Sequence, residues 1–189
     1  STPDRIDFIN ARCVALQHLG RFDDAHNGAQ RALSLDADNA PAHFNLGNAL
    51  YALGQYEEAE TSYRRSIALS PETGGAHKNL AGALMALEQF DSALESFDRA
   101  LELGPKGEDT RTNRSLVYLG LGDFERGWAD YACRFGAERE KDWRDYQCPL
   151  WNGERLDGPL LIWGEQGLGD QILYASMIPD LQQRTTPIV

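Results

Sequence analysis

The sequence is poor in the residues on which disulfide frameworks and metal sites depend. Its 189 residues include three cysteines and four histidines. Cys13, Cys133 and Cys148 are an odd number and show no CxxC spacing, so neither a disulfide framework nor a metal site is expected. Reduced thiols are typical of an intracellular compartment, and we therefore predict a cytoplasmic protein.

An excess of basic charge and long apolar runs are also lacking. The formal net charge is −11, whereas a nucleic acid or an anionic membrane surface requires a basic face on its partner. The chain does not open with the basic and apolar segments of a signal peptide, and no apolar run approaches membrane-spanning length. We therefore expect no nucleic-acid partner, no membrane span and an acidic, solvated surface.

What the chain does contain is an internal repeat. Residues 40–73 and 74–107 align without a gap, at an offset of 34 residues (77 minus 43). Matched positions hold the same residue or a similar one: His43 and His77, Leu46 and Leu80, Leu50 and Leu84, Tyr56 and Phe90, Ala59 and Ala93, Tyr63 and Phe97, Pro71 and Pro105. The same register extends back over residues 6–39 and forward from residue 108.

Each repeat has the pattern of two helices joined by a turn. In residues 40–73, Asp38 or Asn39 can cap a helix that Pro41 begins, because proline is tolerated in the first turn. Leucines and alanines then recur at helical spacing, and Gly54 is suited to a left-handed cap. In the second helix, small Ala59 predicts a close approach of the paired helices.

The period and its residue types resemble the tetratricopeptide repeat. The resemblance implies an all-α fold: an α-solenoid of about four helix-turn-helix repeats, near residues 6–39, 40–73, 74–107 and 108–137, within a superhelix over residues 1–137. The outer repeats depart from the pattern, with Arg12 and Cys13 or Arg114 and Ser115 where Leu-Gly is usual. Such departures are expected at the ends of a solenoid.

In this family the first helix of each pair lines a concave face where partner peptides bind. Asn45, Asn79 and Asn113 share one position of that helix, and a primary amide can pair with any peptide backbone because it both donates and accepts. The series resembles the asparagine ladder of O-GlcNAc transferases. A second interpretation stays open, in which these residues only shape the helix surface. Asn48 and Lys78 lie on or beside the same surface and would add polar contacts.

Two other ligand types fit the repeats less well. The basic clamp with which chaperone-binding members grip a peptide carboxylate is not evident in the sequence. His43 and His77 lie one repeat apart without an acidic or cysteine companion. We therefore interpret both histidines as packing residues and expect no metal.

The sequence changes character after residue 137. Residues 138–158 mix charged, aromatic and proline residues without a period and predict an irregular connector. Residues 159–164 form a short apolar run typical of a buried parallel strand. Gly167 and Gly169 then predict a sharp turn before a helix, whose N-terminus suits an anion. We therefore expect a C-terminal α/β stub over residues 159–189.

The string PLWNGERLDGPLLIWGEQGLGDQILYASMIPDL resembles bacterial proteins in which tetratricopeptide repeats precede a heptosyltransferase-like domain of the GT-B fold. Gly169, Asp170 and Pro179 match that family's turn and helix. The resemblance implies that Asp170 is the general base and that the full-length protein binds a sugar nucleotide. An N-cap role for Asp170 stays open as the alternative, and Glu165 and Gln166 stand where the family has a basic residue.

Two functions follow from these patterns. The first is a scaffold that binds a protein or an extended peptide on its concave face, without a cofactor in this chain. The alternative is the acceptor-recognition part of a glycosyltransferase whose catalytic domain is mostly absent from these residues. The open edge of the predicted strand, Leu160–Trp163, also predicts self-association.

Overall fold

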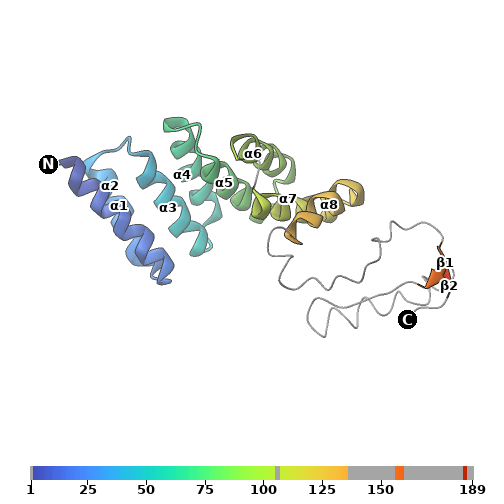
Figure 1. Cartoon of the computed structure of the whole chain (residues 1–189). Coiled ribbons are helices and arrows are strands. Elements are labelled where there is room, and N and C mark those ends of the chain that lie inside the picture. The colour runs from blue at the N-terminus through green and yellow to red at the C-terminus, as the bar shows by residue number, and fades with distance from the viewer. Residues whose placement is uncertain (1, 105–106, 136–155, 160–184, 187–189) are drawn as a thin grey trace. The chain divides into compact units, whose positions relative to one another are not determined.

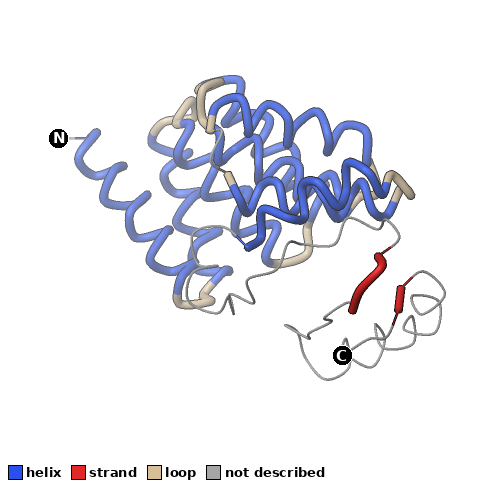
Figure 2. Tube along the Cα trace, turned by 45° about the vertical axis from the view of Figure 1, so that its right-hand side comes forward, coloured by secondary structure: helices blue, strands red, loops and turns tan. Residues whose placement is uncertain are grey.

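The computed structural model describes residues 2–104, 107–135, 156–159 and 185–186. The chain divides into two units, Ser1–Lys141 and Asp142–Val189. In the described part of the first unit, helices follow one another along the chain (Figure 1) and are joined by short loops (Figure 2).

The helices of the first unit form four successive pairs, in agreement with the predicted all-α solenoid. Their bounds are α1 Thr2–His18, α2 Phe22–Leu35, α3 Ala40–Ala52, α4 Tyr56–Leu69, α5 Gly74–Ala86, α6 Phe90–Leu103, α7 Glu108–Gly120 and α8 Phe124–Tyr131, followed by a short 3₁₀ helix, η1, Ala132–Phe135. The last three pairs begin at residues 40, 74 and 108, so the sequence period sets the spacing of the helices. The first helix begins at Thr2 instead of Ile6.

Local chemistry explains where these helices begin and turn. The side chain of Asn39 accepts a hydrogen bond of 3.0 Å from the backbone N–H of Ala42, which confirms the predicted cap. Gly20, Gly54 and Gly122 all adopt a positive φ at the equivalent turn. At the remaining turn this conformation falls on Glu88, whose φ is 58°.

The core lies between the helices of a pair and between neighbouring pairs. Among the described residues, its largest cluster extends from Leu50 to Val117 and includes Tyr63 and Phe97, the two largest fully buried side chains there. Ala59 and Ala93, the small residues predicted at the contact between paired helices, are fully buried within the same cluster. Burial of apolar surface, rather than helix propensity, therefore holds the array together.

The first helices of successive pairs touch one another. Helix α1 contacts α3, α3 contacts α5, and α5 contacts α7, whereas contacts between the second helices of neighbouring pairs are sparser. Crowding of the first helices places them on the inner side of the curved array. Residues exposed on the inner side of α1, α3, α5 and α7 thus share one surface.

The described residues of the second unit form two short parallel strands. Strand β1, Leu156–Pro159, pairs with β2, Thr185–Thr186, with Leu156 opposite Thr185 and Pro159 opposite Thr186. Strand β1 begins at Leu156, within the segment predicted to be an irregular connector, so that prediction was wrong at its C-terminal end. The sequence pattern did not predict this strand, because Asp157 and Gly158 interrupt any apolar run there. The predicted strand beyond Pro159, Leu160–Trp163 included, lies outside the described residues.

Candidate functional site

The inner surface made by α1, α3, α5 and α7 is termed here the A-helix face. One helix position, repeated every 34 residues, marks it: Val14, Asn48, Gly82 and Leu116. Val14 is 42% exposed and Leu116 is 49% exposed, so the face presents apolar side chains at both ends. Between them the same position holds the polar Asn48 and then Gly82.

Three side-chain amides form a hydrogen-bonded row across this face. Asn48 donates from Nδ2 to Oε1 of Gln17 over 3.4 Å, and Asn79 donates from Nδ2 to Oδ1 of Asn48 over 2.8 Å. Gln17 in turn donates from Nε2 to the backbone oxygen of Asn45 over 2.9 Å. These residues of α1, α3 and α5 are each half-buried. We call Gln17, Asn48 and Asn79 the amide ladder.

A buried tyrosine anchors the ladder to the core. The phenol of Tyr63 donates a 2.9 Å hydrogen bond to Oδ1 of Asn48. Burial raises the pKa of Tyr63 above its usual value, and the neighbouring Tyr51 adds to the rise, so the phenol stays protonated as a donor. Gly47 makes room for its ring, because a Cβ at that residue would lie 2.6 Å from Tyr63 Cε1. The middle rung is therefore held in a fixed orientation.

The structure removes Asn45 from the predicted peptide track. Its side chain is 3% exposed and donates to the backbone oxygen and to Oδ1 of Asn10, over 3.4 and 3.5 Å. Asn10 continues this contact by donating to Oδ1 of Asn39 over 3.0 Å. Asn45 thus joins α3 to α1 instead of facing a ligand. For Asn45, the interpretation in which the asparagines serve the fold and not a ligand is the one that fits.

The other predicted peptide-binding residues are on or near the surface. Asn79 is half-buried within the amide ladder, Lys78 beside it is half-buried, and Asn113 is exposed. The three asparagines of the predicted series therefore have three different environments. The predicted catalytic residue Asp170 and the predicted phosphate-binding turn, Gly167 and Gly169, lie outside the described residues.

The ladder includes a residue that the sequence reasoning missed. Gln17, Asn48 and Asn79 are spaced by 31 residues, not by the 34 of the repeat, so they occupy different positions in their helices. Neighbouring first helices are offset along their axes, and residues about one turn apart therefore meet across them. A search for amide side chains spaced by 31 residues, which is one helical turn less than the repeat, would have found Gln17.

Both repeated histidines bond to the loop before their helix. Nε2 of His43 lies 3.0 Å from the backbone oxygen of Ala37, and Nε2 of His77 lies 3.0 Å from that of Pro71. Within the described residues, no group of three or more His, Cys, Asp or Glu side chains is placed to hold a metal ion. No helix there is long and apolar enough to cross a membrane.

Solved structures with the same fold include three proteins of different kinds. MamA from Desulfovibrio magneticus has a TM-score of 0.65 and 20% identity, covering 72% of this chain and 77% of its own. A mutant O-GlcNAc transferase of Thermobaculum terrenum has a TM-score of 0.61 and 26% identity, covering 62% of this chain and 23% of its own. The first TPR of Spaghetti (RPAP3), bound to an HSP90 peptide, has a TM-score of 0.60 and 19% identity, with coverages of 63% and 94%.

Sequence comparison gives the family directly. Protein FlbA of Caulobacter vibrioides is 38% identical over 77 residues, which are 39% of this chain and 13% of that protein, so this chain spans a small part of that relative. The family model for the tetratricopeptide repeat matches residues 14–73, 46–108 and 78–134, which together cover more than half of the chain. With four helix pairs at the matching period, the chain belongs to the tetratricopeptide repeat family.

Proposed function

We propose that this chain is a protein-binding scaffold that holds an extended peptide along the A-helix face. The amide ladder is the observation that carries this proposal. It runs continuously over three first helices and is anchored by Tyr63 from below. A row of oriented amides suits the repeated N–H and C=O groups of an extended backbone.

The ladder retains capacity for a ligand. A primary amide carries two N–H donors, and the described hydrogen bonds use one donor of Gln17 and one of Asn48. The second donor of each can bind a peptide carbonyl. Because the first donors already fix both side chains, little rotamer freedom is lost on binding.

Residues around the ladder would set which peptides bind. Val14 and Leu116 offer apolar contacts at the two ends, and Tyr51 exposes its ring on α3 between them. Lys78 adjoins the ladder and favours a carboxylate on the ligand. The net charge of −11 on the whole chain discourages a strongly acidic peptide, so a single acidic residue among apolar ones fits best.

Support from relatives is of a general kind. The first TPR of RPAP3 has been solved with an HSP90 peptide bound, so the helical framework that this chain shares can carry a peptide. The identity of 19% extends that support to the fold alone.

The test is a selection of peptides followed by substitution of the ladder. Random linear peptides displayed on phage are selected against the whole chain, and their affinities are measured by calorimetry. Asn79→Ala and Gln17→Ala should each weaken binding about fivefold to tenfold, since each removes about one hydrogen bond. The matched control is Gln55→Ala, which removes an exposed amide in the turn between α3 and α4.

The proposal is contradicted when selected peptides bind Asn79→Ala and Gln17→Ala as tightly as the original chain, which would place their site away from the ladder. Circular dichroism could instead show that Asn79→Ala unfolds the chain. In that case Lys78→Glu provides the decision, because it changes the charge beside the ladder without removing a rung, and an unchanged preference for acidic peptides would count against the face.

A second candidate function concerns the second unit. We propose that it begins a sugar-nucleotide-binding domain of a glycosyltransferase, for which the repeats select the acceptor. The parallel pairing of β1 with β2 favours this, since parallel strands need a crossover connection of the type found in nucleotide-binding α/β domains. In a protein extended beyond Val189, titration with nucleotide sugars should show binding, and Asp170→Asn should lower transfer without lowering affinity. Absence of both binding and hydrolysis would exclude this candidate.

A further inference from the structure

Two aromatic rings of α3 lie on either side of the amide ladder. Phe44 precedes Asn48 by four residues and Tyr51 follows it by three, so the three side chains share the inner side of α3. Phe44 is half-buried, and its ring centroid lies 6.1 Å from that of Tyr63. Tyr51 is 40% exposed, and its ring centroid lies 5.3 Å from that of Tyr56. Each ring is therefore supported by a tyrosine of α4.

The next first helix, α5, places a glycine opposite each ring. A Cβ at Gly75 would lie 3.9 Å from Cζ of Phe44, and one at Gly82 would lie 3.8 Å from Cε2 and from the hydroxyl oxygen of Tyr51. These are ordinary van der Waals distances, so close packing does not require either glycine. A glycine within a helix also lowers its stability relative to alanine. We call Phe44 with Gly75, and Tyr51 with Gly82, the ring–glycine pairs.

The two ring–glycine pairs are arranged symmetrically about the ladder. Asn79, which donates to Asn48, lies four residues after Gly75 and three residues before Gly82. Each pair joins residues 31 apart, as the rungs of the ladder do. The two glycines are seven residues apart in one helix, a distance of about 10 Å at 1.5 Å per residue. The ladder thus has room for a large side chain beside a ring on each of its two sides.

This arrangement occurs once in the described repeats. The positions equivalent to Phe44 and Tyr51 in the other first helices hold no aromatic residue: Asn10, Lys78, Thr112, Gln17, Met85 and Leu119. Those equivalent to Gly75 and Gly82 hold no glycine: Asp7, Pro41, Asp109, Val14, Asn48 and Leu116. The ring–glycine pairs are therefore not part of the general repeat pattern. They lie between α3 and α5, with described helices on both sides.

A basic side chain lies on the same stripe of α5. Lys78 lies between the two glycines and is half-buried beside Asn79. Among the described residues its amine makes no ion pair, not even with Asp109 on α7, which stands 31 residues further along. An amine without a partner on a chain with a net charge of −11 attracts a carboxylate.

The geometry of an extended backbone connects these features. In a strand the N–H and C=O groups point sideways, whereas successive side chains point in opposite directions at right angles to them. When the backbone groups of a peptide face the amide ladder, adjacent side chains therefore point along the helices. One of them points toward Phe44 and the other toward Tyr51.

We propose that the A-helix face selects extended segments of a partner protein that carry two adjacent large apolar residues, a specificity that rests on the proposed function of peptide binding. One apolar side chain packs on Phe44 over Gly75, and its neighbour packs on Tyr51 over Gly82. A carboxylate of the same segment pairs with Lys78. The uncovered rings, the missing side chains opposite them and the unpaired amine together define this occupant.

The probes are synthetic heptapeptides with acetylated and amidated ends. SSLLESS carries adjacent leucines, SLSLESS has the same composition with its leucines two residues apart, and SSAAESS carries alanines instead. Each is titrated into the whole ¹⁵N-labelled chain, and its affinity is read from the amide chemical shifts. SSLLESS should bind about twentyfold more tightly than SSAAESS, because two leucine side chains leave water. It should bind about fivefold more tightly than SLSLESS, whose leucines point to the same side.

Substitution of the glycines shows where the leucines lie. Gly75→Gln and Gly82→Gln place a polar side chain beside the rings, and each should weaken SSLLESS about fivefold because one leucine is displaced. The matched control is Thr61→Gln, which adds the same side chain at an exposed position of α4. Replacing the peptide's glutamate by glutamine should weaken binding about threefold in the original chain. The same replacement should have no effect in Lys78→Gln.

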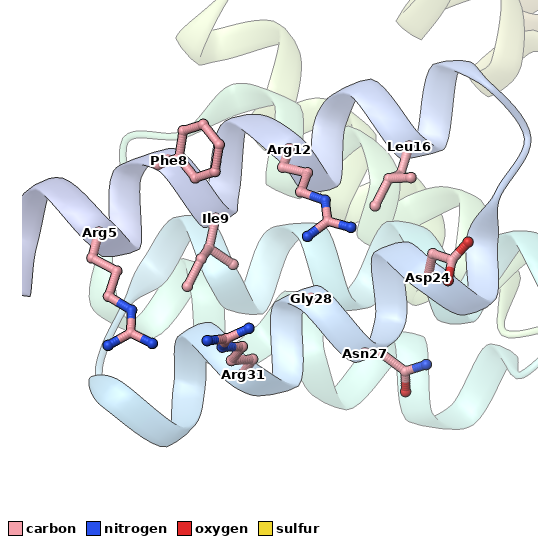
Figure 3. A pocket seen from close by; sticks show the side chains of 9 residues that line it. All are labelled: Arg5, Phe8, Ile9, Arg12, Leu16, Asp24, Asn27, Gly28 and Arg31. Atoms are coloured by element: carbon pink, nitrogen blue, oxygen red, sulfur yellow. The ribbon is translucent and has the colours of Figure 1, made fainter.

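A second surface with apolar side chains could hold such peptides instead. A groove of about 350 Å³ lies between α1 and α2, and Figure 3 shows Ile9 and Arg12 of α1 extending toward α2. Shifts confined to amides of this groove would overturn the proposal. Failure of SSLLESS to bind, or equal affinities for SSLLESS and SLSLESS, would overturn it as well.

Gln17→Ala distinguishes failure of this inference from failure of the proposed function. Weaker binding in both glycine variants but not in Gln17→Ala would support selection by the ring–glycine pairs and count against the ladder. Weaker binding in Gln17→Ala alone would support the ladder and overturn the selection. Circular dichroism checks that each variant folds. If the glutamine variants unfold, Gly82→Ala provides the decision, because it should weaken SSLLESS about twofold while the helix gains stability.

Discussion

Single residues in this array often serve two neighbouring helices at once. Oδ1 of Asn39 accepts hydrogen bonds from Ala42, which caps α3, and from Asn10 of α1, each over 3.0 Å. The same side chain therefore begins one helix and holds it to the previous pair. Asn10 also accepts from the buried Asn45, so a small polar cluster joins the first two pairs.

Substitution at Asn39 separates these two contributions. Asn39→Ala should lower the free energy of unfolding by about 1–3 kcal/mol, because it removes the cap and leaves Asn10 without its acceptor. Asn39→Ser keeps a capping oxygen that does not reach Asn10, and an intermediate loss is expected. Urea denaturation measures both. Equal stability of the Ala and Ser variants would show that the cap contributes nothing.

Cys13 illustrates how burial controls reactivity. Its side chain is fully buried and its Sγ approaches the backbone oxygen of Ala25. Burial raises the pKa of the Cys13 thiol, and the Arg12 guanidinium offsets part of this effect. A raised pKa lowers the thiolate fraction at any given pH, and buried sulfur is shielded from reagents as well.

Labelling with a maleimide at pH 8 tests this. In single-cysteine variants, Cys13 should react at least about tenfold more slowly than Cys133, which is only half-buried. Unfolding in urea should make the two rates equal. Equal rates in the folded chain would mean that the first pair opens on the timescale of labelling.

At the scale of elements, small residues set how closely the two helices of a pair approach. A Cβ at Gly47 of α3 would lie 2.6 Å from the ring of Tyr63, whereas a Cβ at Gly82 of α5 would meet nothing closer than Tyr51 at 3.8 Å. The two glycines lie in the interiors of equivalent helices. They therefore offer a comparison of crowding with helix propensity.

Alanine should have opposite effects at these two positions. Gly82→Ala should raise the free energy of unfolding by about 0.5–1 kcal/mol, because alanine favours helix. Gly47→Ala should lower it by about 1–3 kcal/mol, because the ring of Tyr63 and its bond to Asn48 must shift. Thermal unfolding followed by circular dichroism distinguishes the signs. Stabilisation by both alanine substitutions would show that the ring of Tyr63 can shift without lowering the free energy of unfolding.

The elements were largely predictable from the sequence, because each is specified within one repeat. The period, the cap at Asn39 and the turn at Gly54 all follow from residues close in the chain. The candidate site was less predictable. Asn45 is buried because it contacts Asn10, and the position one repeat after Asn10 holds Phe44 instead of an asparagine. Gln17 joins the ladder because neighbouring first helices are offset along their axes. Both depend on how one pair is placed on the next.

At the scale of the molecule, the first unit has an uneven core. The largest buried cluster extends over α3 to α7, whereas the first pair contributes to two small clusters around Ile6 and Leu16. In a linear array each pair is stabilised only by its neighbours, and a pair at the end has fewer of them. Stability should therefore be greatest in the middle.

Hydrogen exchange followed by mass spectrometry tests this gradient. Amides of α4, α5 and α6 should exchange most slowly, and those of α1 and α2 should exchange faster, because the latter open without disrupting the central cluster. Uniform exchange across all helices would instead show that the unit unfolds as a single cooperative block.

The equal spacing of the last three helix pairs has a genetic consequence. Those pairs begin at residues 40, 74 and 108. Unequal recombination between the coding sequences of two repeats therefore removes or adds a whole pair and leaves every remaining helix complete. Gene length can thus vary in units that preserve each turn and cap, while pairings such as Asp98 with Arg114 constrain which pairs can become neighbours. Natural variants of this array should differ in their number of pairs more readily than in the length of any one pair.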